Sequence, residues 1–549
     1  MEQRAKDIVK IGDKLFDSKR QLDGLWQEIA LNFYPERADF TDQRNVGEEF
    51  SDHLFSSYPV LARRELGNML AASLRPRSQK WFSVHVDDED LDERDDVRGF
   101  LEHISKIQWR AMYDDDAGLV DSTSKADHDF ATFGNAVLKV GPNLNADGLL
   151  FQNFHLRDNA WSMNAQGKVD CNHRNWEPTA RQLVQHFGDK VSKNVKEAFK
   201  KDPEKTFRCR HVVLPTRMYD YKDKFGKKFP YASLYVECES ETVLEEVGSN
   251  YFCYVIPRWH TVAGSQYGTS MATAVCLPDG RTLQIVTRTI REAGEKYVDP
   301  PMIVVSDAIR GDIALYAGGV TSADVEYDER LGEVLRPVSQ DKSGFPIGAE
   351  IAAALRQDIR EAFFLDKIQL PETGKDMTAF EVRRRIEEHI RAASPIFEPI
   401  ESQYSSPLCE TTFQVLKDYR AFPFDEMPEE LEGRETNFSF RSPLADFADQ
   451  RDAEVYIDGV TRILIPAAQI DPAQLENADL TESTRGALRA IGWKAKWLKP
   501  VEMVKQRQME NQKAAAMAKG MQALGAGAEI AETGGNAAKA INEATAPPA

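Results

Sequence analysis

The sequence predicts an α+β fold that is predominantly α, and three observations support this. Apolar residues recur every three or four positions in long segments near the N-terminus and in the middle of the chain, as on one face of a helix. Between residues 130 and 256, short apolar runs are separated by Gly, Asn, Asp and Pro, a pattern typical of strands and turns. The chain has 549 residues, of which 42% are hydrophobic and 29% charged, and this is enough apolar material for several cores.

The N-terminal third is expected to begin with two helices. The first carries an apolar stripe and ends at Pro35, and the second lies between Pro59 and Pro76. A strand should follow, because the apolar residues alternate with polar ones at 82–86. A helix is expected near 180–199, and further strands are expected at 136–140, 149–151, 234–237 and 251–256.

Two long helices of nearly equal length are expected in the middle of the chain. Their apolar stripes should pack against each other, and they consist of Leu283, Val286, Ile290, Ile351, Leu355, Ile359 and Phe363. Prolines at 300 and 301 stop the first helix, and Pro371 lies just beyond the second. Residues 300–347 hold short apolar runs broken by Gly and Pro, so the pattern predicts a helical hairpin with a small β-rich lobe at its far end.

A short polar loop follows the second long helix. It consists of Gln369, Leu370, Pro371, Glu372, Thr373, Gly374, Lys375 and Asp376. Thr378 and Glu381 then form a capping box that opens another helix. Two or three helices are expected within 451–520, and the Ala- and Gly-rich residues 521–549 are expected to be disordered.

Charge and hydropathy argue against several classes of protein. Asp and Glu number 88 against 69 Lys and Arg, a net charge of −19, which disfavours a protein that grips nucleic acid by neutralising phosphates. Mean hydropathy is −0.48, and no stretch approaches the roughly 18 apolar residues of a membrane-spanning helix. The N-terminal residues lack the apolar region of a secretory signal. The six cysteines are scattered, so we expect no disulfide framework, no metal site and no cofactor.

One segment, Gly268-Thr269-Ser270-Met271-Ala272, resembles the nucleophile region of subtilisin-like hydrolases. That chemistry requires a His that accepts the serine proton and an Asp that orients the His. No His is followed by Gly, no Asp-Ser-Gly or Asp-Thr-Gly occurs, and neither GxxxxGK[ST] nor HExxH is present. We therefore expect a protein that is not an enzyme, with Ser270 at a turn or helix start, and keep the subtilisin-like hydrolase as a lesser alternative.

Several motifs together resemble the portal (head-to-tail connector) proteins of podovirus-type bacteriophages. In the family's order, they are LWQEIA at 25–30, ARRELGNMLAASL at 62–74, FGNA at 133–136, YGTS at 267–270 with LPDGRTL at 277–283, and MTAFEVR at 377–383. The chain departs from the family pattern at Met271-Ala272, where a small residue and a proline are usual. Its C-terminal region is similar only in its helical, Gln- and Arg-rich character.

The resemblance implies a portal fold in a ring oligomer, usually a dodecamer. The implied parts are a wing at 1–268, a first stem helix region at 269–299, a β-rich clip at 300–347, a second stem helix at 348–368, a tunnel loop at 369–377, a long helix and following wing segment at 378–450, and a helical crown at 451–520. The ring would form a channel at one capsid vertex of the virion, the head-tail junction, through which double-stranded DNA is packaged and ejected.

The implied partners are other copies of the chain, the DNA in the channel, the packaging terminase or ATPase, tail adaptor proteins, and capsid and scaffolding proteins. Internal core proteins are a further candidate, no membrane is involved, and assembly would occur in the host cytoplasm. A different virion structural or scaffolding protein is the closest alternative, because it would share the composition without forming rings.

The residues expected to face the channel follow from this architecture. Lys375 in the tunnel loop is expected to touch DNA transiently. The candidates in the stem are Arg288, Arg291, Arg356, Arg360 and Lys367. Residues 281–297 carry a charge of +2 and 348–377 a charge of −2, so the stem is balanced and should bind DNA weakly. The clip, with eight acids and four bases, suits a basic partner.

Overall fold

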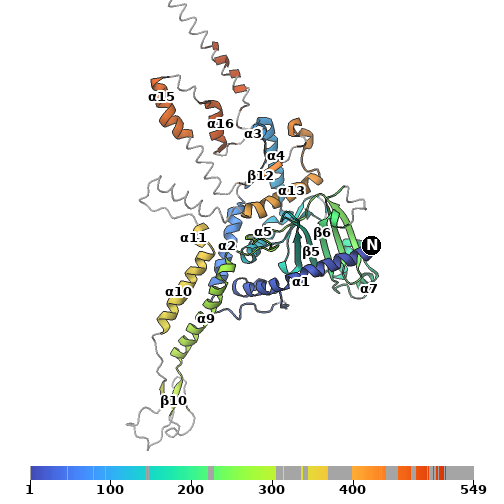
Figure 1. Cartoon of the computed structure of the whole chain (residues 1–549), viewed down its shortest axis with the longest axis vertical. Coiled ribbons are helices and arrows are strands. Elements are labelled where there is room, and N and C mark those ends of the chain that lie inside the picture. The colour runs from blue at the N-terminus through green and yellow to red at the C-terminus, as the bar shows by residue number, and fades with distance from the viewer. Residues whose placement is uncertain are drawn as a thin grey trace, which may run out of the picture. The chain divides into compact units, whose positions relative to one another are not determined.

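The computed structural model describes residues 2–45, 47–77, 80–92, 94–143, 145, 147–219, 228–304, 313, 335–337, 344–368, 399–431, 433, 436–440, 456–471, 478–490 and scattered positions from 493 to 514. The chain divides into two compact units (Figure 1). The first comprises Met1–Trp81 and Ile107–Phe422, and the second comprises Phe82–Lys106 and Pro423–Ala549. Helices predominate among the described residues, and the predicted α+β class is confirmed at this level.

The first unit contains helices from the predicted wing and from the predicted stem. They are α1 (Glu2–Phe33), α2 (Tyr58–Leu74), α5 (Leu119–Phe133), α6 (Ala180–Phe187), α7 (Lys193–Lys201), α8 (Thr216–Tyr219), α9 (Thr273–Val298), α10 (Gly344–Ala362), α11 (Leu365–Ile368), a π-helix (Glu401–Ser405) and α13 (Ser406–Asp418). The helix predicted near 180–199 is two helices, because the chain turns at Gly188, whose φ of 56° favours glycine.

All sheets in the first unit are antiparallel. The larger sheet has the order β4-β5-β6-β7-β8, with β4 Asn159–Met163, β5 Val169–Trp176, β6 Cys209–Pro215, β7 Tyr231–Glu237 and β8 Thr242–Ser249. The smaller sheet has the order β3-β2-β9, with β2 Leu138–Pro142, β3 Leu149–Asn153 and β9 Tyr254–Val255. These strands confirm those predicted within 136–256, and β4, β5, β6 and β8 are additional.

Helices cover both faces of the larger sheet. Because successive strand residues point to opposite faces, Val212 and Leu214 on β6 lie in one apolar cluster with Ala5 and Ile8 of α1, whereas Cys209 lies in another. The second cluster holds apolar residues of α6 and α7. Both faces of the sheet are therefore buried, and α1 (blue in Figure 1) crosses the sheet on its way to the stem.

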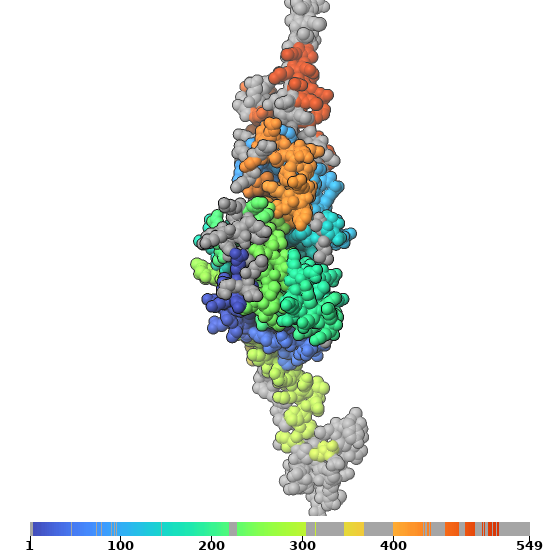
Figure 2. All heavy atoms as spheres, turned by 90° about the vertical axis from the view of Figure 1, so that its right-hand side faces the viewer, coloured from blue at the N-terminus to red at the C-terminus, as the bar shows by residue number. Residues whose placement is uncertain are grey.

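The helical hairpin predicted from the middle of the chain is present. Helices α9 and α10 lie side by side (Figure 1), and short strands β10 (Met302–Val304) and β11 (Leu335–Pro337) pair antiparallel at its far end. Figure 2 shows the yellow-green atoms of the stem extending beyond the blue and green atoms of the body. We call α9 and α10 the stem and the rest of the first unit the body.

The second unit holds β1 (Phe82–Val86), the strand predicted from alternation. It pairs with β12 (Thr436–Phe440), and Phe82 lies opposite Phe440. The unit also contains α3 (Glu89–Asp92), the start of α4 (Asp95–Met112), a π-helix (Val460–Leu464), α15 (Ile465–Ile470) and α16 (Leu480–Ala490). The last three lie in the region predicted to be helical.

Within the described residues, no helix is long and apolar enough to cross a membrane. All six cysteines are free, and four of them are buried.

Candidate functional site

The two stem helices are in close contact at a glycine. A Cβ atom at Gly348 of α10 would lie 3.2 Å from Ile290 Cγ1 of α9, so the absent side chain makes room for the isoleucine. Near the body, Asp279 of α9 and Asp358 of α10 are close enough to interact electrostatically. The start of α9 therefore lies beside the end of α10, and the helices are antiparallel.

The predicted packing residues differ in their burial. Leu283, Ile359 and Phe363 are buried. Val286, Ile290 and Leu355 are half-buried. Ile351 is 45% exposed within the single chain, which therefore does not cover it.

The base of the stem packs on the end of α1. The fully buried ring of Phe33 lies 5.6 Å from the ring of Phe363, measured between centroids. On its other side the ring lies against Gly280, where an added Cβ would be 2.9 Å from Phe33 Cζ. Phe33 is thus wedged between the two stem helices and the body. Beyond it α10 ends, since Phe364 adopts a left-handed backbone with φ of 56°.

A glutamine fixes the stem to the segment before α2. Gln284 Oε1 accepts hydrogen bonds from the backbone N–H groups of Phe55 and Ser56, both at 2.8 Å, and its Nε2 donates to the Ser56 carbonyl at 2.9 Å. All three contacts use the side-chain amide of a residue that is only 9% exposed. They therefore specify both the position and the rotation of α9.

A second joint brings together the FGNA and YGTS motifs. Asn135 Nδ2 donates to the Gly268 carbonyl at 2.7 Å, and Asn135 Oδ1 accepts from the Gly268 N–H at 2.8 Å. Gly134 adopts a φ of 69°, and a Cβ there would lie 2.1 Å from the backbone carbon of Thr269. Only glycine allows this approach of the two backbones.

Ser270 is the first residue of the turn into α9. Its hydroxyl donates to the Ala131 carbonyl at 2.7 Å and accepts from the N–H groups of Ala272 and Thr273. The hydroxyl of Thr273 donates to the Thr132 carbonyl at 2.6 Å. Both hydroxyls thus satisfy carbonyls at the end of α5. The predicted role of Ser270 at a helix start is confirmed, and the subtilisin-like alternative is not favoured.

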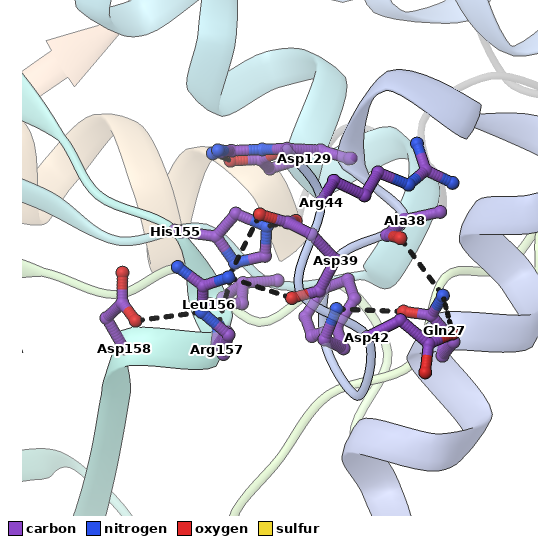
Figure 3. Close-up of polar contacts among 12 residues, drawn as sticks. Gln27, Ala38, Asp39, Asp42, Arg44, Asp129, His155, Leu156, Arg157 and Asp158 are labelled. Carbon is purple, nitrogen blue, oxygen red and sulfur yellow. Dashed lines mark hydrogen bonds and ion pairs between the residues drawn. The ribbon is translucent and has the colours of Figure 1, made fainter. Parts of the chain in front are cut away.

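A polar network holds the loop that follows α1 (Figure 3). Arg157 donates to the backbone carbonyl of Asp39 at 2.9 Å and to its carboxylate at 3.0 Å, while His155 Nε2 lies 2.6 Å from that carboxylate. Burial alone would raise the pKa of Asp39, but His155 and Arg157 outweigh it and lower the pKa. Gln27 of α1 donates to the Ala38 carbonyl and accepts from the N–H of Phe40.

The candidate channel cations have different surroundings. Arg288 donates to Glu292 at 2.7 Å, and Arg360 donates to Asp366 at 2.7 Å. Arg291 and Arg356 are exposed and make no ion pair within the part of the chain that the structure describes. Lys367 lies on α11, and its side chain is outside the description.

The predicted tunnel loop, Gln369 to Asp376 with Lys375, lies outside the described residues, as does most of the predicted clip. Among the residues described, no group of three or more His, Cys, Asp or Glu side chains could hold a metal ion. Asp279 and Asp358 form a two-carboxylate pair at the base of the stem. Burial, followed by the charge of Asp358, raises the pKa of Asp279.

Comparison with known proteins assigns the family. Residues 5–498 match the family model described as bacteriophage head to tail connecting protein. The chain belongs to this family. The resemblance to phage portal proteins drawn from the motifs is thereby confirmed, and the head-to-tail connecting proteins are structural components of the virion.

The alignments of two relatives cover nearly the whole length of this connector. It is 25% identical over 513 residues to the probable portal protein of Bordetella phage BPP-1, covering 90% of this chain and 89% of the relative. It is 22% identical over 546 residues to the portal protein of Salmonella phage epsilon15, covering 97% and 96%. A solved structure of the virion of a native gene transfer agent particle is similar with a TM-score of 0.32 at 8% identity, covering 77% of this chain and 92% of that one.

Sequence reasoning missed the residues that join the connector's stem to its body. Gln284 lies on the polar side of a helical pattern, where a glutamine is ordinarily solvated, and nothing local signals its partners 228 residues away. For Asn135 a signal existed, because a Gly-Asn pair is typical of a tight turn. The identity of its partner, Gly268, depends on tertiary structure.

Proposed function

We propose that this connector is a portal subunit, copies of which form a ring around a channel for double-stranded DNA, with the twelve subunits that the resemblance implies. The observation that carries the proposal is the stem: two antiparallel helices joined at their far end by a β-ladder and anchored to the body at their base. This rod leaves apolar residues such as Ile351 exposed, and several rods packed side by side would enclose a pore.

The charge of the stem fits passage of DNA without retention. Two of the five candidate cations are paired with carboxylates of the same chain, which reduces the number of positive charges that could neutralise phosphates. Each neutralised phosphate adds affinity, so a wall with few free cations lets a polyanion slide.

The remaining assignments of the proposal come from the resemblance. The wing is 1–268 with 378–450, the stem 269–299 and 348–368, the clip 300–347, the tunnel loop 369–377 and the crown 451–520. The ring would assemble in the host cytoplasm and occupy one capsid vertex. There it would bind the terminase during filling, and tail adaptors afterwards, in contact with capsid, scaffolding and core proteins.

Electron microscopy of the purified full-length chain tests the proposal directly. Negatively stained particles should be rings with a central hole, and light scattering should give a mass that is an integral multiple of 61.9 kDa. Particles without a hole, or only monomers at micromolar concentration, would favour the alternative of another structural or scaffolding protein.

A further inference from the structure

The stem presents two unlike broad sides, and we propose that one side of each stem binds the other side of the stem in the next copy. This inference rests on the proposed ring and deepens it, because it names the surfaces through which neighbouring subunits meet. We call the two sides the isoleucine face (Ile285, Ile347, Ile351 and Asp358) and the arginine face (Ala349, Ala353, Arg356 and Arg291). This proposal assigns Arg291 and Arg356 to the contact between subunits, in place of the channel wall where the resemblance predicts them.

Helical geometry places the isoleucine face on one side of the hairpin. Each residue turns a helix by about 100°, so Ile351 lies about 70° from the line of Gly348 and Ile359 that faces α9. On α9, Ile285 lies about 150° from the line of Leu283 and Ile290 that faces α10. Both displacements have the same sense along their own helices. Because the helices are antiparallel, both residues are displaced toward the same broad side, with Ile285 at its outer edge.

The arginine face is displaced in the other sense. By the same reckoning, Ala349, Ala353 and Arg356 lie about 70° to 130° from the contact line of α10, and Arg291 lies about 90° from that of α9. All four side chains are exposed. The two faces are therefore back to back on one hairpin.

The isoleucine face exposes three large apolar side chains to solvent. Ile285 is 65% exposed, Ile347 58% and Ile351 45%, and none of them faces the partner helix. Covering such side chains is favourable by roughly 1.5 to 3 kcal/mol for each one fully buried. A second copy would supply that cover without any further protein.

The opposite face matches the isoleucine face in size and in charge. Ala349 and Ala353 have small side chains. Along the axis of α10, one lies about 3 Å before Ile351 and the other about 3 Å after it. Arg356 lies about 3 Å along the axis from Asp358. Among the described residues, neither Arg356 nor Asp358 has an ion-pair partner within its own chain.

The heights of these residues along the stem fit a ring in which neighbouring copies are related by rotation about an axis nearly parallel to the stem. Such a rotation leaves each residue at the same height, so Ile351 of one copy meets the alanines of the next, and Asp358 meets Arg356. A contact between unlike faces repeats from copy to copy and closes into a ring when the rotation divides a full turn.

A pair of cysteines provides the first test. In the full-length variant Ile351→Cys/Ala353→Cys, residues i and i+2 point apart on one helix, so a disulfide can form only between copies. Mild oxidation should give a ladder of dimers, trimers and higher species on denaturing gels. Each single variant, Ile351→Cys or Ala353→Cys, should stay monomeric. A dimer from a single variant would show that like faces meet, and a double variant without a ladder would also overturn the proposal.

Charge reversal provides a second test that does not depend on oxidation. Asp358→Arg and Arg356→Asp should each reduce the yield of rings at least tenfold, and the double variant should recover them. Glu350→Arg, an exposed acid outside both faces, is the matched control and should form rings normally. If the wild type forms rings and the single reversals do too, these faces are wrong while the portal proposal stands. If the wild type forms no rings, the portal proposal itself fails.

Discussion

Asn135 and Gly268 hold each other through two hydrogen bonds of 2.7 and 2.8 Å, although 133 residues separate them. Both residues belong to motifs that the sequence shares with portal proteins. In the fold they form a joint, since the strand that begins after helix α5 is bound to the turn that begins stem helix α9. The motifs therefore record how the stem is attached to the body.

Replacement of Asn135 should weaken this joint measurably. Asn135→Ala removes three hydrogen bonds, two to Gly268 and one to the Phe133 carbonyl, and leaves the buried N–H and C=O of Gly268 without these partners. We therefore expect a loss of about 2 to 4 kcal/mol in the free energy of unfolding. Urea denaturation followed by circular dichroism measures the loss. The control Asn194→Ala, an exposed position on α7, should change it by less than about 0.5 kcal/mol. Equal effects of the two variants would contradict a special role for Asn135.

Two glycines of α9 should respond oppositely to the same substitution. Gly280→Ala places a methyl group 2.9 Å from Phe33 Cζ in a buried site, and overpacking of this kind costs about 1 to 3 kcal/mol. Gly294→Ala meets nothing within 4 Å and should stabilise the helix by about 1 kcal/mol. Thermal unfolding of both variants beside the wild type gives the comparison. A stabilised Gly280→Ala protein would show that Phe33 does not hold the stem base.

Acid should destabilise the body through a buried histidine. Burial, with a smaller contribution from Arg210, lowers the pKa of His173 to about 3. In the unfolded chain the pKa of His173 is near 6.5, so above pH 6.5 the imidazole is neutral in both states and stability is not reduced. As the pH falls from 6.5 toward 3, the unfolded chain binds a proton that the folded chain does not, and stability is lost progressively. At pH 4.5 the loss from this group is on the order of 2 to 3 kcal/mol.

The variant His173→Gln isolates this contribution. Its melting temperature should fall less steeply than that of the wild type between pH 7.5 and 4.5. His260→Gln, in which an exposed imidazole is replaced, should follow the wild-type curve. Parallel curves for all three proteins would exclude His173 as a source of acid sensitivity.

A tunnel-loop variant tests the proposed DNA contact. Lys375→Ala should leave ring formation intact, because the loop is expected to lie in the channel rather than between subunits. Removing one cation per subunit should change the amount of DNA that filled particles retain by about two-fold or more. Quantification of packaged DNA per particle measures this. Lys168→Ala, an exposed lysine on the body, is the control, and a Lys375→Ala particle with normal filling would show that the loop lysine does not act on DNA.

Local patterns in the sequence predicted the long elements well. The apolar stripe of α1 and the stop at Pro35, and the paired stripes of α9 and α10, arise from periodicity and proline, which act within a few residues. The break after Ala362 was not predicted, because Phe364 has no sequence signal for a positive φ and its backbone is imposed by packing near Phe363. The pairing of β1 with β12 could not be predicted either, since Val86 and its partner Thr436 are 350 positions apart and their pairing is set by tertiary structure.

The candidate site was predictable in its elements and less so in its contacts. Apolar periodicity identified Leu283 and Ile359, which are buried, but it could not distinguish them from Ile351, which has the same spacing and remains exposed. Periodicity states only that a residue lies on an apolar side. Whether the partner is the neighbouring helix or another molecule depends on the angle at which two helices cross, and that angle depends on close contacts such as Gly348 with Ile290.

The bonds that fasten the stem to the body come mainly from uncharged groups: the amides of Asn135 and Gln284 and the hydroxyls of Ser270 and Thr273. The ion pair between Arg281 of α9 and Glu28 of α1 is exposed and worth little. Dissolved ions do not screen neutral dipoles, and such groups do not titrate near neutral pH. The attachment should therefore keep its strength from dilute buffer to the concentrated electrolyte around tightly confined nucleic acid, while contacts made by the arginines weaken as ionic strength rises.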